Sequence, residues 1–97
     1  MVLHHLQLLI SSLSEAKAFY LAALAPLGFK EHHATKGLVG LGGPDGICDL
    51  WLKEDDSPTK GMHIAFVAES REVVDKFYEA ALYIHPRSFE GECLVTL

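Results

Sequence analysis

The stretch that decides the fold is His5–Ser12, with the sequence HLQLLISS, because a related stretch, HIAFVAES, returns 58 residues later as His63–Ser70. The similarity continues at the same offset, with FYLAAL at residues 19–24 and FYEAAL at residues 77–82. When residues 5–24 are aligned with residues 63–82, seven of the 20 positions are identical. Similarity at a fixed offset indicates a repeated structural unit. The sequence therefore predicts two copies of one module.

Each copy has the pattern of a strand followed by a helix. Leu6, Leu8 and Ile10 alternate with other residues, which is the period of a strand with one strongly apolar face. Ser12 stands three residues before a Glu, the spacing of a capping box at a helix start, and Ser70 holds the same place in the second copy. Apolar residues at helical spacing follow each Ser.

The segment between the two copies predicts three further strands: Phe29–Ala34, Gly37–Gly42 and Ile47–Lys53. The polar, Pro-containing run 54–60 has the composition of a linker. Module one, residues 1–53, is thus predicted as βαβββ. Only 15 residues follow the second helix, enough for at most one short strand, so module two, residues 61–97, is predicted to be incomplete.

Composition limits the chain to a single domain and excludes several functions. Its 97 residues carry a net charge of −5 without any cluster of basic residues, which argues against nucleic acid and anionic membranes as partners. The longest nearly apolar stretch, residues 18–27, is too short to span a bilayer. Two cysteines without a disulfide spacing favour a reducing compartment, and we expect a cytoplasmic location.

The repeated segments resemble the vicinal oxygen chelate superfamily, which includes glyoxalase I, extradiol dioxygenases and bleomycin-binding proteins. The resemblance covers residues 3–82 and rests on His5–Leu8, Ala16–Tyr20, Leu24–Phe29, His63–Ala68 and Phe77–Leu82. It implies an α+β fold of paired βαβββ modules, here one glyoxalase-like domain over residues 1–97 with a truncated second module. It also implies a cup-shaped sheet with a divalent metal ion on its concave face.

Carried over by position, the resemblance assigns metal ligation to His5, His63 and, more loosely, Asp49. The last strand of module two usually supplies a carboxylate in this family, and Glu92 is the candidate there. The strand pattern independently favours the two histidines, because each lies opposite the apolar stripe of its strand. Two neutral imidazoles at equivalent points could converge on Zn, Fe, Mn or Ni. The alternative is that the two histidines only form hydrogen bonds at the wall of a cavity.

Three other residues on the predicted strands bear on the site. Gln7 shares the strand face of His5, and Trp51 shares the face of Asp49, so both are expected to line a substrate pocket. A wall residue without a ligand is the equal alternative for Trp51. Cys48 is expected to be buried on the apolar face of its strand rather than to act as a nucleophile.

These observations leave three functions open. The first is the metal-dependent transformation of a small oxygenated metabolite by an isomerase, lyase or dioxygenase. The second is metal-free binding of an apolar compound, as in bleomycin-resistance proteins, and the third is an inactive truncated chain. An open sheet edge and an uncovered apolar face around Ile64 and Phe66 also predict a homodimer.

Overall fold

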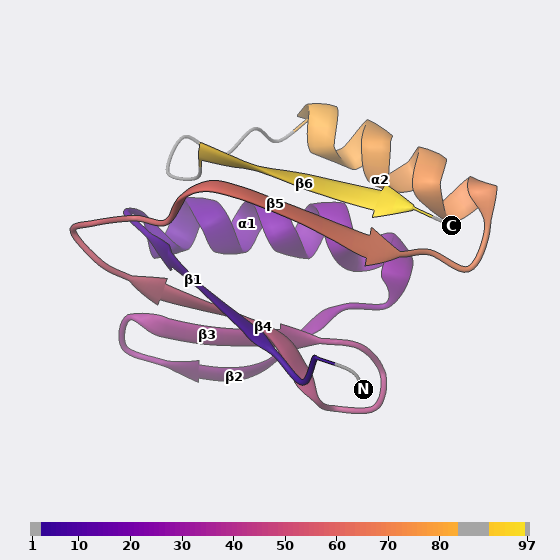
Figure 1. Ribbon diagram of the computed structural model, residues 1–97. Helices are drawn as coiled ribbons and strands as arrows, with labels where there is room; N and C mark the ends of the chain where they lie inside the picture. Colours follow the sequence, from indigo (N-terminus) through magenta and orange to yellow (C-terminus); the bar gives the residue numbers. More distant parts are fainter. Residues whose placement is uncertain (1–2, 84–89, 97) are drawn as a thin grey trace.

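The chain folds into two strand–helix units of unequal size (Figure 1). The computed structural model describes the backbone of residues 3–83 and 90–96 and the side chains up to residue 81. In chain order the elements are β1 (Leu6–Ile10), α1 (Leu13–Leu24), the short 3₁₀ helix η1 (Ala25–Leu27), β2 (Lys30–Thr35), β3 (Leu38–Gly42), β4 (Cys48–Glu54), β5 (Lys60–Val67), α2 (Arg71–Tyr83) and β6 (Glu90–Thr96).

The first unit is the predicted βαβββ module. Its sheet has the order β1-β4-β3-β2, with β1 parallel to β4 and the remaining pairs antiparallel. Helix α1 packs against β3 and β4 and covers one face of this sheet (Figure 1). The three strands predicted between the repeats therefore all form. The α+β architecture expected from the repeat is confirmed.

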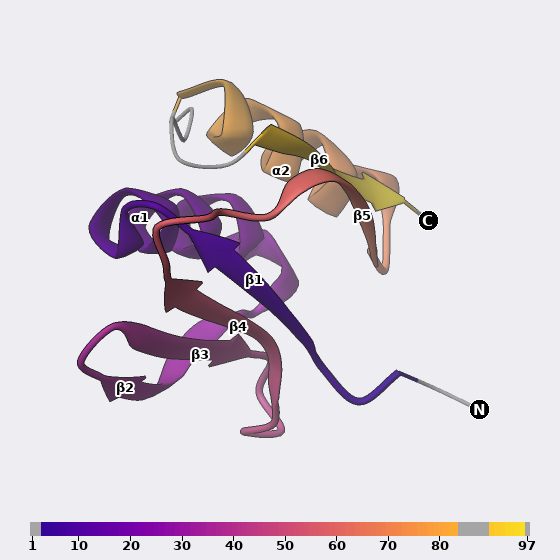
Figure 2. The same ribbon diagram turned by 60° about the vertical axis from the view of Figure 1, so that its left-hand side comes forward.

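The second unit repeats the beginning of the first and then differs from it. In the part that the structure describes, β5 is followed by α2 and by a single further strand, β6, which runs parallel to β5. The relation of β5 to β6 is thus that of β1 to β4. The two sheets meet where the end of β1 and the start of β5 lie together, and Figure 2 shows the strands diverging from that point. There the backbone N–H of Thr59 donates to the carbonyl of Leu9 at 2.8 Å.

The core lies between the first sheet and the two helices. Its buried members come from both units and are Leu8, Ile10, Ala16, Phe19, Tyr20, Ala23, Leu24, Val39, Leu41, Leu50, Leu52, Ile64, Ala68 and Phe77. Both predicted helix caps form: Ser12 Oγ accepts from the N–H of Glu15 at 3.4 Å, and Ser70 Oγ accepts from the N–H of Val73 at 3.3 Å. Within the described residues, no helix is long and apolar enough to cross a membrane.

Equivalent positions of the repeat differ in burial. Tyr20 on α1 is 0% exposed, whereas its counterpart Tyr78 on α2 is 62% exposed. Helix α1 contacts two strands of a four-stranded sheet, whereas the described contacts of α2 are with β6, η1 and α1. The repeated sequence therefore packs one tyrosine into the core and leaves the other on the surface.

Candidate functional site

A groove separates β1 from β5 and forms a cavity of about 470 Å³. Its walls are mainly apolar and come from Leu6 on β1, Leu27 and Phe29 after α1, and Ile64 and Phe66 on β5. The rings of Phe29 and Phe66 meet edge to face, with centroids 5.7 Å apart. This packing joins residues from the two units in one wall. The groove is an apolar surface that a small molecule can reach.

Two of the predicted site residues, His5 and Asp49, lie in this groove. His5 directly precedes β1 and is exposed, whereas Asp49 on β4 is half-buried. The parallel register pairs Leu6 with Leu50, and His5 and Asp49 each stand one residue before these partners. Strand pairing therefore brings an imidazole and a carboxylate to the same end of the groove.

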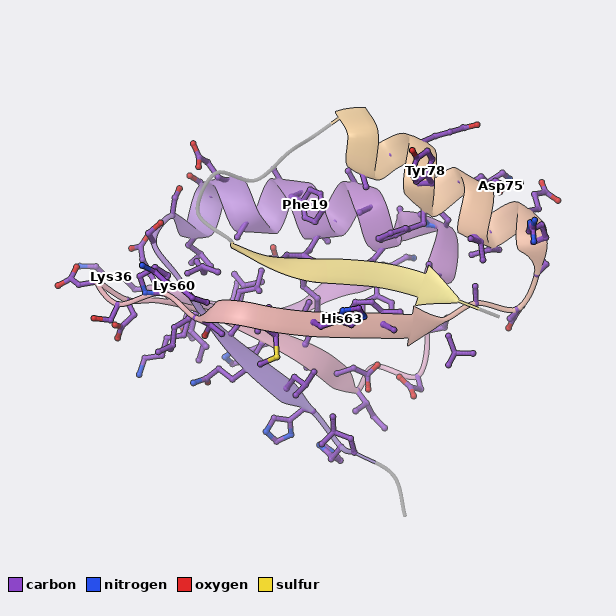
Figure 3. All side chains as sticks on the ribbon, turned by 45° about the horizontal axis from the view of Figure 1, so that its top comes forward. Phe19, Lys36, Lys60, His63, Asp75 and Tyr78 are labelled. Atoms are coloured by element: carbon purple, nitrogen blue, oxygen red, sulfur yellow. The ribbon has the colours of Figure 1, made fainter. Side chains whose placement is uncertain are left out.

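The third predicted ligand, His63, lies on β5 and is exposed (Figure 3). It is not among the residues that line the groove, although its neighbour Ile64 is. Among the described side chains, no three of His, Cys, Asp or Glu lie close enough together to hold a metal ion. The described side chains therefore do not fit a three-ligand metal centre.

The backbone of β6 gives Glu92, the candidate carboxylate of module two, a defined partner on β5. The register of β5 and β6 pairs His63 with Glu92. This repeats the neighbouring positions of His5 and Asp49 in the first unit. The repeat similarity ends at residue 82, so no pattern in the sequence located β6 beside β5. Glu92 is thus the positional counterpart of Asp49.

Gln7 and Trp51, the predicted pocket residues, are paired with each other across β1 and β4. Gln7 is exposed and Trp51 is half-buried, with its ring 5.2 Å from that of His33. Neither residue is among those lining the groove. The structure therefore brings these two side by side but does not place them in the lining of the groove.

Cys48 does not occupy the buried position expected for it. The register of β3 and β4 shifts next to Cys48, so that Gly42 pairs with Cys48 rather than with Asp49. A Cβ added at Gly40 would lie 2.7 Å from the Cys48 Sγ and 2.9 Å from the Trp51 ring, which places the thiol beside Trp51. Cys48 is only half-buried, so the expected packing among the apolar residues of β4 is wrong. Strict alternation fails here because the strand contains an irregularity.

The electrostatics around Cys48 follow from this position. Partial burial, and then the negative charge of the adjacent Asp49, raise the pKa of the Cys48 thiol above its usual value. A raised pKa favours the neutral thiol, which is the weaker nucleophile. The geometry therefore gives no support to a nucleophilic role for this cysteine.

His4 and His5 form an unexpected pair at the mouth of the groove. Their Nδ1 atoms are 2.8 Å apart, and their rings meet edge to face with centroids 5.1 Å apart. One Nδ1 must donate its proton and the other must accept it, so the accepting ring carries its own proton on Nε2. While this hydrogen bond lasts, only one of the two rings presents an unprotonated Nε2. Adjacent residues of an extended segment point to opposite faces, so strand alternation does not account for this contact.

Comparison with known proteins agrees with this architecture. The family model for the Glyoxalase/Bleomycin resistance protein/Dioxygenase superfamily matches residues 2–82, most of the chain. No curated protein matches the sequence.

Solved structures with the same fold include a glyoxalase/bleomycin resistance protein from Albidiferax ferrireducens T118. It is 24% identical, with a TM-score of 0.71 over 82% of this chain and 69% of that one. Another is the structure of a possible glyoxalase from Bacillus cereus, 22% identical, with a TM-score of 0.67 over 97% of this chain and 98% of the other. With the family match and the paired strand–helix units, the chain belongs to the glyoxalase/bleomycin resistance protein/dioxygenase superfamily.

Proposed function

We propose that this chain binds a small, largely apolar molecule in the groove between β1 and β5. The observation that supports the proposal is the cavity of about 470 Å³, whose walls are apolar and whose polar groups gather at the end held by His5 and Asp49. Small-molecule sites commonly measure about 300–1,000 Å³ and combine apolar walls with a few polar groups. Of the functions left open by the sequence, ligand binding without a metal fits this geometry best.

The walls would supply affinity and the polar end would orient the ligand. Covering Leu27, Phe29 and Phe66, which are partly buried, removes apolar surface from water. His5 and Asp49 are neighbours by strand register and offer hydrogen-bonding groups, so a ligand with a single polar group has a favoured orientation. No covalent chemistry is needed for this role.

Isothermal titration with the uncharged probe 1-naphthylmethanol tests the proposal. Ala65 lines the groove and is exposed, so Ala65→Trp should fill the cavity and abolish binding. The matched control is Ala18→Trp, an exposed position on α1 outside the groove, which should leave the affinity unchanged. No binding to the wild type, or equal binding to Ala65→Trp, would contradict the proposed function.

A metal-dependent isomerase, lyase or dioxygenase is the second candidate, supported by one observation. Strand register gives each unit an imidazole next to a carboxylate position, His5 with Asp49 and His63 with Glu92. Titration with Zn²⁺, Fe²⁺, Mn²⁺ and Ni²⁺ should then give binding that is lost in the His5→Ala/His63→Ala double variant. Equal binding by both proteins would remove this candidate.

We also propose that the chain acts as a homodimer in the cytoplasm. Exposed apolar side chains on the second unit, Val67 at 79% and Tyr78 at 62%, support self-association. The free thiol of Cys48 suits a reducing compartment. Sedimentation, described below, tests the dimer.

A further inference from the structure

A carboxylate among the described residues gives the groove a negative charge. Asp49 is its carboxylate, and none of its described lining residues is Lys or Arg. A second cavity of about 370 Å³ adjoins it, since both share Leu27, Phe29 and Val67. The second cavity contains Glu69 and again no Lys or Arg among its described lining residues. Apart from the two histidines, the ionisable groups among the described residues that line these two cavities are thus acidic.

Asp49 has no counter-ion in the described part of the chain. The ion pairs seen there join Lys17 to Glu31 and Lys76 to Glu72, both away from the groove. A partly desolvated carboxylate without a partner is unfavourable, and a bound cation relieves that cost. The carboxylate is therefore available to a ligand.

The aromatic wall favours the same type of ligand. Phe29 and Phe66 contribute both hydrophobic surface and ring faces, and aromatic faces attract cations through their quadrupole. Among the described lining residues, an anionic ligand would meet the charge of Asp49 with nothing positive to compensate it, apart from a protonated histidine. Charge and wall chemistry thus point to the same ligand class.

We infer that the groove selects an apolar organic cation, with a hydrocarbon or aromatic body against Phe29 and Phe66 and an ammonium group paired with Asp49. This inference rests on the proposed function and specifies its ligand class. An uncharged compound of the same shape binds the same walls without the ion pair. An anion of the same shape is repelled.

The experiment compares three naphthalene probes of similar size by isothermal titration in buffer containing a chelator. They are 1-naphthylmethylammonium, 1-naphthylmethanol and 1-naphthoate. We expect the cation to bind wild type about tenfold more tightly than the alcohol, the size of one charge-assisted contact, and the anion to bind most weakly. Asp49→Asn should make the cation and the alcohol equal, whereas Asp49→Glu should retain part of the preference.

Asp75→Asn is the matched control. Asp75 is exposed on α2 and is not among the residues that line either cavity, so its loss should leave the preference for the cation intact. Equal affinity of wild type for cation and alcohol would overturn the inference and leave the proposed function standing. A preference that persists in Asp49→Asn would overturn the assignment to Asp49. Failure of every probe to bind would instead contradict the proposed function.

Discussion

Asp49 and Cys48 are adjacent on β4, and the charge of Asp49 adds to the effect of burial in raising the pKa of the Cys48 thiol. We predict that Asp49→Asn lowers the pKa of the Cys48 thiol, because it removes the negative charge that disfavours the thiolate. The pKa should stay above its usual value, since partial burial is the larger cause and remains. Alkylation by iodoacetamide as a function of pH, in a Cys93→Ser background, measures the change. Asp56→Asn, an exposed position, is the control and should leave the profile unchanged.

The raised thiol pKa also sets a direction for stability. The unfolded chain ionises Cys48 at the usual pKa, whereas the folded chain keeps the proton to higher pH. The contribution of Cys48 to the free energy of unfolding is therefore fully present below the pKa of the unfolded chain. It is lost as pH rises through the pKa of the folded chain. Denaturation at alkaline pH should show a smaller loss of the free energy of unfolding in Asp49→Asn than in wild type. An equal loss in the two proteins would contradict this account.

Gly40 allows the close approach of Cys48 and Trp51. We predict that Gly40→Ala lowers the free energy of unfolding by about 1–3 kcal/mol, because its Cβ would lie 2.7 Å from the sulfur and 2.9 Å from the indole ring. Urea denaturation, monitored by the fluorescence of Trp51, the single tryptophan, measures both the stability and the environment of the indole ring. Gly43→Ala is the control, since a Cβ there meets nothing within 4 Å. Similar effects of the two substitutions would argue against this packing.

Individual site residues differ in how far the sequence could predict them. His5 was predicted from the strand pattern and the family resemblance and Asp49 from the resemblance alone, and both lie in the groove. Leu27 and Phe29 were not anticipated there, because the groove arises where β1 and β5 separate, which no local pattern encodes. The position of Cys48 was wrong because a register shift interrupts the alternation of β4.

The helices depend on local capping that the repeat conserves in both copies. Ser12 Oγ accepts from the N–H of Glu15, one of the backbone donors left free at the start of α1. We predict that Ser12→Ala lowers the free energy of unfolding by about 1 kcal/mol. Urea denaturation measures the loss. Ser11→Ala, at the exposed residue before it, should have little effect and controls for loss of a hydroxyl.

Elements with strong local patterns were predictable, and those that depend on distant partners were not. Strands β1 and β5 and helices α1 and α2 follow from apolar period and caps. The pairing of β6 with β5 joins residues about 30 positions apart, from Lys60 with Glu90 to Val67 with Thr96. Parallel pairing of this kind requires a crossover connection, and its register cannot be read from the short apolar run in β6 alone.

At the scale of the whole molecule, the two units bury unequal amounts of apolar surface. Tyr20 packs beneath a four-stranded sheet and is 0% exposed, whereas the equivalent Tyr78 is 62% exposed. Val67, at the end of β5, is 79% exposed. Exposed apolar side chains of this size commonly mark an interaction surface. Among the described residues, Tyr78 therefore has no covering layer like the one over Tyr20.

A second copy of the chain can supply that layer, and the prediction is a homodimer that buries Tyr78. Sedimentation velocity over micromolar concentrations should show reversible dimers. Tyr78→Lys should weaken association by about tenfold or more, because tyrosines often dominate interface energetics and a buried lysine would lose its hydration. Ala18→Lys, at an exposed position on α1, introduces the same charge elsewhere and should not change association. A compact monomer at every concentration, or equal association of both variants, would show that Tyr78 stays in water.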